Sequence, residues 1–503
     1  MEDARKYMAT CPGERYAISP AVCRARRERN YPRCRGCVFN PEGEAGEESA
    51  APATPVETTR SVFKAYDIRG TYPAQIDVAF ARRMGQATAM FLKAHSLVVG
   101  HDVRTSSPEL TEALIDGILS VGTNVADTGM CSTPFHYFVV GTLEADGGVM
   151  VTASHNPPQY NGFKVSRQAV VPVGSETGLA DIRQMIESDV APPPAKKRGR
   201  RIPMDLVDHY IDHVVQGARP GRKLRVAVDT GNGAAGLYVL PVFRRLPHEI
   251  LPLYLEPDGR FEHHDPNPMK DENLLDLVDR VRDTEADLGV ALDGDGDRVV
   301  FVTEDGKRVP NDIMTALVAR ELIETEPGAT IIYDLRSSWV VREEIEAAGG
   351  TAIEERVGHA FIKDTMRKHN AVFGGELSGH FYFRDNFYAD SGLMAMVKAL
   401  NVISQSDQPF SELVKPLLRY HATGEINFQV TDQDAKLAQI ERQFDDGEIS
   451  HLDGVTVRYD DWWFNVRKSN TEPVVRLTME ARTAERLESA KARVLDVLGK
   501  PAR

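Results

Sequence analysis

One arrangement recurs three times along this chain of 503 residues: a short β-rich run, then an aspartate, then small or polar residues. It occurs as LVVGHDVRTSS (97–107), LRVAVDTGNGAAG (224–236) and TIIYDLRSSWV (330–340). Each apolar run is too short for a helix and precedes a stretch that can be helical, such as the residues after Pro108. Because the copies lie roughly a hundred residues apart, the pattern predicts three consecutive, similar α/β domains rather than one large sheet.

The last part of the chain has a different pattern. GEINFQVT and VVRLTMEA alternate like strands, and TAERLESAKARVLDVLG has the spacing of an amphipathic helix. A smaller α+β domain is therefore expected from about His421 onward.

The first 60 residues stand apart from this body. Residues 39–60 are poor in aliphatic and aromatic side chains and rich in Glu, Ala, Pro and Thr, which is typical of a flexible linker. Four of the five cysteines precede it: Cys11, Cys23, Cys34 and Cys37. Thiolates two residues apart can share one metal, so the cluster is a candidate zinc or iron–sulfur site. Reduced thiols on a basic arm are the alternative, and the sequence leaves both open.

The charge balance limits what the chain can bind. With 60 basic and 74 acidic side chains, the formal net charge is 60 − 74 = −14. This argues against a general affinity for nucleic acid or an anionic membrane, so an anionic ligand needs a local cluster of cations. The N-terminus lacks the apolar stretch of a signal peptide, and no apolar run approaches the length of a membrane span. We expect a cytoplasmic protein. Its oligomeric state is left open, with a monomer as one alternative.

The stretch VTASHNPPQYNGFK (151–164) places Ser154 and His155 side by side between turn-forming dipeptides, with Lys164 beyond them. Neighbours in sequence are poorly placed to act as nucleophile and base, and no G-x-S-x-G elbow surrounds this serine. The stretch therefore does not predict a serine hydrolase of that type.

Three aspartates alternate with glycines in LGVALDGDGDRVVFVT (288–303): Asp293, Asp295 and Asp297. Carboxylates this close repel one another unless a cation lies among them. An EF-hand also begins D-x-D-x-D, but its sixth position, which needs glycine, is Arg298 here, and the flanks have the pattern of strands. Three hard oxygen ligands with open coordination positions suit Mg²⁺. A solvated acidic turn is the alternative.

Three further stretches carry candidate binding groups. RVGHAFIK places His359 after a glycine, although a lone histidine is more often structural. FGGELSGHFYF sets Glu376, Ser378 and His380 at alternate positions, a combination suited to sugar hydroxyls, or a polar hairpin loop. FNVRKSNTEPVVRL follows a strand-like run with a guanidinium, hydroxyls and a turn, which can form a phosphate cradle; its candidates are Arg467, Ser469, Asn470 and Thr471.

Taken together, these residues resemble the α-D-phosphohexomutase family, most closely its phosphomannomutase/phosphoglucomutase branch. The resemblance extends from FKAYDIRG (63–70) to near the C-terminus and excludes the cysteine arm. Four motifs occur in the family's order: TASHNP, DGDGDR, GGELSGH and RKSNTEP. The ordered set is specific, whereas each motif alone is weak.

The resemblance implies a heart-shaped enzyme with three α/β domains containing mixed sheets, a smaller α+β domain and a central active-site cleft. The expected boundaries are 1–58 for the arm and linker, 59–203, 204–307 and 308–420 for the α/β domains, and 421–503 for the last domain. One motif would come from each domain: the phosphoserine, metal-binding, sugar-binding and phosphate-binding loops in that order.

The resemblance also implies the chemistry. Phosphorylated Ser154 would give its phosphoryl group to a hexose 1-phosphate or 6-phosphate, forming a hexose 1,6-bisphosphate that reorients and returns its other phosphate. Mg²⁺ would be held by the three aspartates and an oxygen on Ser154, with Arg298 nearby, and the bisphosphate would also act as activator. Lys164 and His359 are the candidates for acid–base work, with His155 lining the site. Substrate contacts are implied for Tyr66, Arg69, Arg336, Glu376, Ser378, His380, Arg467, Ser469, Asn470 and Thr471.

Two positions bear on the sugar. Leu377, within GGELSGH, is closest to the branch with methionine there, which accepts glucose and mannose. Arg336 stands where that branch usually has lysine, so a planar fork replaces a point charge. The expectation is a mutase for mannose and/or glucose phosphates, with sugar phosphates as its partners. The alternatives are a phosphoglucosamine mutase, a hydrolase acting through the same phosphoserine, and a sugar-phosphate sensor whose cysteine arm does the signalling.

Overall fold

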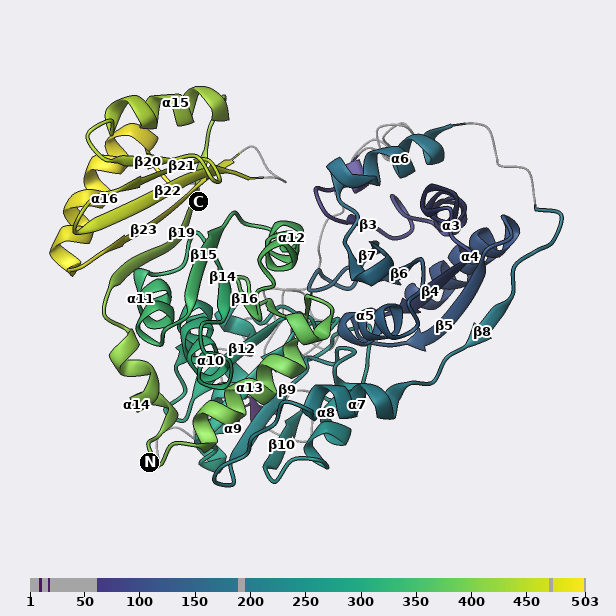
Figure 1. The fold of residues 1–503 in the computed structure, drawn as a ribbon, viewed down its shortest axis with the longest axis horizontal. Helices are drawn as coiled ribbons and strands as arrows, with labels where there is room; N and C mark the ends of the chain where they lie inside the picture. Colours follow the sequence, from purple (N-terminus) through teal and green to yellow (C-terminus); the bar gives the residue numbers. More distant parts are fainter. Residues whose placement is uncertain (1–8, 11–16, 19–60, 189–194, 470–473, 502–503) are drawn as a thin grey trace.

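The computed structural model describes residues 9–10, 17–18, 61–188, 195–469 and 474–501. These residues form four units arranged along an arc, with the first and fourth at opposite ends (Figure 1). A short antiparallel pair, β1 (Ala9–Thr10) and β2 (Ala17–Ile18), precedes them. The four cysteines of the candidate metal site lie outside the described residues.

The first unit is built on a mixed sheet with the strand order β3-β7-β6-β4-β5-β8. The strands β6, β4, β5 and β8 run parallel; β7 pairs antiparallel with β6, and β3 pairs antiparallel with β7. Helices α3, α4 and α6 pack on one face and α5 on the other. The elements are β3 (Ile68–Thr71), α3 (Val78–Leu92), β4 (Ser96–His101), α4 (Ser107–Ser120), β5 (Asn124–Met130), α5 (Thr133–Thr142), β6 (Gly147–Val151), β7 (Tyr160–Arg167), the 3-10 turns η3 (Gln168–Val170) and η4 (Ser175–Thr177), α6 (Leu179–Glu187) and β8 (Arg201–Pro203).

The second and third units share one topology. Their sheets have the orders β10-β9-β11-β12-β13 and β15-β14-β16-β17-β18. In each, the first three strands are parallel, and the fourth is antiparallel to both of its neighbours. The second unit contains α7 (Val207–Val215), β9 (Arg225–Asp229), α8 (Gly236–Phe243), β10 (Glu249–Leu253), η5 (Asp271–Asn273), α9 (Leu275–Thr284), β11 (Leu288–Leu292), β12 (Val299–Thr303) and β13 (Arg308–Val309). The third contains α10 (Asn311–Thr325), β14 (Thr330–Asp334), α11 (Trp339–Ala347), β15 (Thr351–Glu355), α12 (His359–His369), β16 (Phe373–Gly375), β17 (Phe381–Phe383), η6 (Arg384–Asn386), β18 (Ala389–Asp390), α13 (Gly392–Ser404), α14 (Phe410–Val414) and η7 (Lys415–Leu417).

The fourth unit is an antiparallel sheet with the order β19-β23-β22-β21-β20 and two helices packed on it. Its elements are β19 (His421–Gln429), α15 (Gln433–Gln443), β20 (Glu448–Ser450), β21 (Val455–Arg458), β22 (Trp462–Lys468), β23 (Val474–Ala481) and α16 (Ala484–Leu498). The prediction of three α/β units with mixed sheets and a final α+β unit is therefore confirmed.

The recurring aspartate performs the same task in each of the first three units. Asp102 follows the last residue of β4, and Asp229 and Asp334 end β9 and β14. Each carboxylate accepts a hydrogen bond from the backbone N–H two residues later, at 3.0, 2.7 and 2.9 Å respectively. Such local bonds turn the chain sharply at the end of a strand. The repeated sequence pattern thus marks the carboxyl ends of three central strands.

The apolar core explains how the units are joined. One cluster of buried side chains runs from the α5 face of the first unit through the second and third units. The fourth unit has a separate core around Trp462, Phe464 and Leu477. Hydrophobic burial therefore joins the first three units directly, and polar contacts described below connect the fourth to the third.

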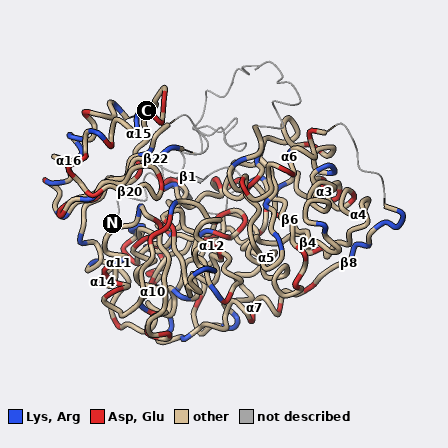
Figure 2. The backbone as a smooth tube through the Cα atoms, turned by 45° about the horizontal axis from the view of Figure 1, so that its top comes forward, with Lys and Arg blue, Asp and Glu red and all other residues tan. Residues whose placement is uncertain are grey.

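The described surface carries charges of both signs. Basic and acidic residues are interspersed along the backbone of all four units (Figure 2). Among the described residues, no helix combines the length and the apolar character needed to cross a bilayer.

Candidate active site

The Ser154 loop leaves the buried strand β6 and returns as β7. Ser154 is 1% exposed and has a positive φ of 52°, which is uncommon for a residue with a side chain. Its backbone N–H donates to the Thr152 hydroxyl at 2.8 Å, and its Oγ lies 3.1 Å from Nδ1 of His155. Burial, followed by the Arg298 charge, lowers the pKa of His155 well below its usual value. The loop thus presents a fixed hydroxyl beside a neutral imidazole.

A wholly buried arginine braces this loop. Arg104 donates Nη2 to the carbonyls of Ser154 (2.8 Å) and Asn156 (2.6 Å). Its Nη1 donates to the carbonyls of Pro157 (2.7 Å) and Tyr160 (3.0 Å). The remaining edge, Nε, donates to Asp102 Oδ2 at 3.0 Å. The planar fork of one guanidinium therefore fixes the backbone on both sides of the serine.

The three aspartates occupy the hairpin between β11 and β12, and all are buried. Gly296 adopts a φ of +79°, which lets the hairpin turn. At Gly294 a Cβ atom would lie 2.7 Å from the Ser154 carbonyl oxygen, so only glycine lets the two loops approach this closely. Each aspartate offers one oxygen within 4.8 Å of the others.

Ser154 reaches this hairpin, because its hydroxyl donates to Asp293 Oδ2 at 3.0 Å. Burial, followed by the charges of Asp297 and Asp295, raises the pKa of Asp293 well above its usual value. In the described part of the chain, Oδ1 of Asp295 and Oδ1 of Asp297 are buried and accept no hydrogen bond, although Nε2 of His380 lies 3.4 Å from the second. Two buried carboxylate oxygens that accept no hydrogen bond, with a third ligand beside them, fit a divalent cation with oxygen preference. The residues present therefore suit the Mg²⁺ expected from the sequence.

Lys164 approaches the same cluster from β7. Its Nζ lies 2.7 Å from Asp295 Oδ2 and 2.5 Å from Asp297 Oδ2. Burial lowers the lysine pKa, but these two carboxylates outweigh it and raise the pKa well above the usual range. Lys164 is therefore a buried cation between two of the candidate metal ligands.

A cavity of about 200 Å³ opens above this cluster and is lined by three of the four units. It collects nine of the residues expected from separate motifs: Tyr66, Arg69, Lys164, Asp297, Arg298, His359, Glu376, Ser378 and His380. Arg69 donates Nη1 to Asn156 Oδ1 at 2.8 Å, which connects this wall to the Ser154 loop. Burial raises the pKa of Tyr66 to about 12, so its hydroxyl stays protonated.

The GGELSGH loop forms one polar wall, between β16 and β17. Ser378 Oγ lies 2.9 Å from Glu376 Oε2 and 2.8 Å from His380 Nδ1. Nε2 of His380 lies 3.4 Å from Asp297 Oδ1, beside the metal candidates. Burial raises the pKa of Glu376, but the hydrogen bond and the charge of His380 lower it below the usual range. A carboxylate, a hydroxyl and an imidazole thus face one cavity, as alternation along the loop predicted.

His359 begins α12 at another edge of the cavity. Its ring lies 5.2 Å from that of Tyr66 in an edge-to-face arrangement, and its Nδ1 is buried without a partner among the described residues. Burial, followed by the charge of Lys363, lowers the pKa of His359 well below its usual value. Lys363 itself is 1% exposed and pairs with Asp390 at 3.3 Å. His359 is therefore held in the neutral form.

The expected phosphate-binding residues lie at the junction of the third and fourth units. Arg467 lies one residue before the end of β22. Ser469 follows that strand, and its backbone N–H donates to the carbonyl of Val474 at 2.9 Å. Arg467 and Arg336 both contact Glu425 of β19. None of these residues lines the 200 Å³ cavity, and Asn470 and Thr471 lie outside the described residues.

Sequence reasoning missed several contributors. Asp102 and Arg104 stand in LVVGHDVRTSS, where the turn was recognised but no link to Ser154 was visible. Asp67 lines the cavity beside Arg69 and lies within the AYDIRG stretch. Tyr137 and Asp390 also line it, and their neighbourhoods in sequence give no polar motif. A local sequence pattern cannot show which side chain of a buried helix or strand, such as α5 or β18, borders a cavity.

The chain matches the phosphoglucomutase/phosphomannomutase family in all four parts: α/β/α domain I over residues 60–191, domain II over 208–306, domain III over 310–420 and the C-terminal domain over 425–497. A phosphomannomutase of Escherichia coli K12 is 39% identical over 447 residues, covering 86% of this chain and 97% of the relative. Phosphohexose mutases of Xanthomonas campestris (strain B100) are 39% identical over 430 residues, covering 84% and 96%.

A crystal structure of a phosphoglucomutase/phosphomannomutase family protein from Burkholderia thailandensis has the same fold. It is 33% identical, covers 88% of this chain and 99% of its own, and superposes with a TM-score of 0.81. With four domain descriptions matched in order and relatives this similar over most of the chain, the protein belongs to the phosphoglucomutase/phosphomannomutase family and is a phosphohexomutase, an enzyme of the isomerase class.

Proposed function

We propose that the chain interconverts hexose 1-phosphates and hexose 6-phosphates of mannose and/or glucose through a phosphoserine at Ser154 and a hexose 1,6-bisphosphate intermediate. One observation carries the proposal: the hydroxyl of Ser154 donates at 3.0 Å to Asp293. This aspartate lies in a hairpin where Oδ1 of Asp295 and Oδ1 of Asp297 are buried and accept no hydrogen bond from the described residues. A phosphoryl group on this serine would share a cation with the aspartates, which is the placement that phosphoryl transfer needs.

The reaction begins with Ser154 phosphorylated. The bond between its Oγ and phosphorus breaks, and a bond forms between phosphorus and the 6-hydroxyl oxygen of a hexose 1-phosphate. The hydroxyl proton passes to a base in the cavity, and the Ser154 oxygen keeps the electron pair and regains a proton. The 1,6-bisphosphate then reorients, and its 1-phosphoryl group returns to Ser154, which leaves hexose 6-phosphate.

The residues around the cavity have separate tasks in this scheme. Neutral His359 is a candidate base, and Lys164 is the candidate cation or acid beside the phosphoryl group. Glu376, Ser378 and His380 offer acceptors and donors to sugar hydroxyls, with Tyr66 and Arg69 on the facing wall. Mg²⁺ bound by the three aspartates and an oxygen on Ser154, with Arg298 close by, would neutralise charge on the phosphoryl oxygens.

The phosphate that does not react needs a second cation cluster. Arg336, Arg467 and Ser469 are the described candidates, and Asn470 and Thr471 complete the proposed cradle. Because the phosphoryl group passes through a loose, anionic transition state, catalysis rests on positioning and charge rather than on covalent activation.

Labelling tests the phosphoserine directly. Wild-type protein incubated with ³²P-labelled glucose 1,6-bisphosphate should acquire stoichiometric label on Ser154, and Ser154→Ala should acquire none and lose mutase turnover. Ser166→Ala is the matched control, because Ser166 is also buried but its hydroxyl has no partner among the described residues. Label on Ser154→Ala, or full turnover by that variant, would refute the assignment.

Product analysis separates the remaining alternatives. Glucose 1-phosphate with a trace of the bisphosphate should yield glucose 6-phosphate, whereas free phosphate alone would indicate a hydrolase. Rates with mannose, glucose and glucosamine 1-phosphates rank the substrates. A sugar-phosphate sensor would keep its physiological output in Ser154→Ala.

The N-terminal arm is proposed as a separate element. We retain zinc or iron–sulfur binding as a hypothesis for its four cysteines, and residues 1–58 and the boundaries at 203, 307 and 420 as our division of the chain. Metal binding by the cysteines is tested by metal analysis of full-length protein and of protein lacking residues 1–58, both purified anaerobically without chelators. Absence of stoichiometric zinc or iron in the full-length protein would favour free thiols.

A further inference from the structure

One carboxylate at the junction of the third and fourth units receives three guanidinium groups. Glu425 Oε2 accepts from Arg467 Nη2 at 2.7 Å and from Arg336 Nη1 at 3.2 Å. Its Oε1 accepts from Arg476 Nη1 at 3.0 Å. The arginines come from β22, from the loop after β14 and from β23, so a single glutamate of β19 gathers cations from two units.

Two arginines of this cluster are largely buried, and the glutamate between them is partly exposed and stays ionised. The side chains of Arg467 and Arg336 are 5% and 10% exposed, and that of Glu425 is 28% exposed. Burial raises the pKa of Glu425, but the charges of the three arginines outweigh it and lower the pKa below the usual value. The buried Nε of Arg467 has no hydrogen-bond partner in the part of the chain that the structure describes. Arg467 is therefore held on one side by Glu425 and keeps an unused donor.

The charges in direct contact nearly balance with Glu425 present. Arg336 also binds Asp334, so three cations face two carboxylates and one positive charge remains. Without Glu425 the excess would be two positive charges around the arginine assigned to the substrate's phosphate. An excess of that size around two largely buried arginines would hold a dianionic phosphate tightly.

We propose that Glu425 is a resident carboxylate that occupies Arg467 and Arg336 whenever the substrate's phosphate is absent, and yields them when it arrives. The proposal rests on the function proposed above. In that reaction the arginines must release one phosphate of the bisphosphate and bind the other after the molecule has reoriented. Because an internal carboxylate replaces the departing phosphate, the arginines are never left buried and unpaired, and release becomes less costly.

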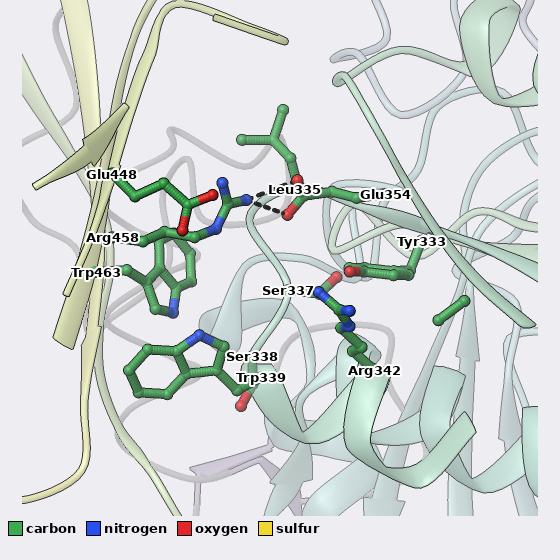
Figure 3. A pocket seen from close by; sticks show the side chains of 11 residues that line it. Tyr333, Leu335, Ser337, Ser338, Trp339, Arg342, Glu354, Glu448, Arg458 and Trp463 are labelled. Atoms are coloured by element: carbon green, nitrogen blue, oxygen red, sulfur yellow. Dashed lines mark hydrogen bonds and ion pairs between the residues drawn. The ribbon is translucent and has the colours of Figure 1, made fainter. Parts of the chain in front are cut away.

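Other contacts join the two units at this junction. Arg458 of β21 donates Nη2 to both carboxylate oxygens of Glu354, at 2.7 and 2.6 Å, beside a pocket of about 310 Å³ (Figure 3). The buried carboxylate of Glu480 accepts from the backbone N–H of Trp339 at 3.0 Å and from Nε1 of Trp463 at 3.1 Å. Removing the charge of Glu425 should therefore leave the fourth unit attached to the third.

Calorimetric titration of Glu425→Gln with glucose 6-phosphate, and separately with inorganic phosphate, tests the proposal. We expect binding tighter by on the order of tenfold for the sugar phosphate, a steeper salt dependence, a lower KM and a lower kcat because release slows. Glu425→Asp keeps the charge and should stay within about threefold of wild type. Glu488→Gln removes an exposed charge from α16, away from this junction, and is the matched control.

Unchanged or weaker binding by Glu425→Gln in a folded protein would overturn the proposal, since it would mean that the glutamate only orients the arginines. If Glu425→Gln does not fold, Glu425→Ala provides the same charge removal. A wild-type protein that lacks mutase turnover while the two variants still differ in phosphate affinity would refute the proposed function and leave this inference standing.

Discussion

The bracing of the Ser154 loop by Arg104 gives the most demanding prediction. Replacing Arg104 by Met removes the hydrogen bonds to four loop carbonyls and leaves the Asp102 carboxylate, 1% exposed, without its cationic partner. Arg104→Lys keeps the charge but loses the planar fork, so it separates the two contributions.

The stability lost in Arg104→Met follows from the groups that lose their hydrogen-bond partner. Breaking a buried ion pair costs about 3–5 kcal/mol, and the lower end applies because Asp102 keeps hydrogen bonds from Ser107 and Thr152. Of the four carbonyl bonds, the one to Ser154 is buried, which adds about 1 kcal/mol, whereas the other three are only partly buried. We expect Arg104→Met to lose about 4 kcal/mol, or roughly 10 °C in Tm for the first unit, and Arg104→Lys about half as much.

Two measurements on the same variants check this. Urea unfolding gives the stability loss, and single-turnover transfer from labelled glucose 1,6-bisphosphate at low temperature gives the rate. The rate should fall by about a hundredfold in Arg104→Met, because a displaced serine no longer faces the hairpin. Adding Asp102→Asn should restore part of the stability and none of the rate. A stability loss below about 1 kcal/mol, or an unchanged transfer rate, would refute the bracing argument.

Three further predictions concern metal, pH and packing. Mg²⁺ should raise the Tm of chelator-treated wild type and restore its turnover, and Asp297→Asn should lose both responses; an equal Tm response in that variant would contradict the assigned ligands. Burial lowers the pKa of His136 to about 3, so the stability that it contributes is present above pH 6.5 and is lost as pH falls toward 3. Urea unfolding of wild type should therefore lose about 2 kcal/mol more than His136→Leu between pH 7.5 and 5, and parallel losses would exclude this cause. A Cβ at Gly85 would lie 2.2 Å from the Leu114 carbonyl oxygen, so Gly85→Ala should cost about 1–3 kcal/mol by forcing α3 from α4, with the turnover of folded protein retained. A neutral denaturation midpoint would argue against that close packing.

Local patterns in the sequence determine much of the fold. Short apolar runs followed by Asp102, Asp229 and Asp334 predicted three strand ends, and each aspartate makes the same turn there. Alternation in GEINFQVT and VVRLTMEA predicted two strands, which became β19 and β23. These features are predictable because hydrogen bonding between near neighbours and the period of apolar residues are properties of the local chain.

The residue types and spacing of the motifs also predict their chemistry. Three carboxylates at alternate positions need a cation wherever they lie, and the four ordered motifs indicated the family. The meeting of Ser154 with Asp293, 139 residues apart, depends on the packing of the first unit against the second. The resemblance to the phosphohexomutase family implied that contact, but the spacing of the residues along the chain does not predict it.

Local sequence therefore specifies the type of each unit, the strand-end turns and the chemical character of the four motifs. Only the tertiary structure showed that Arg104 braces the serine loop, that Tyr137 and Asp390 border the cavity, and that Glu425 gathers three arginines. Each of these depends on where separate elements come to rest against one another. Strand and helix periodicity is the same whether a side chain faces packed neighbours, a cavity or a distant charge, so burial and the pairing of charges are decided in three dimensions.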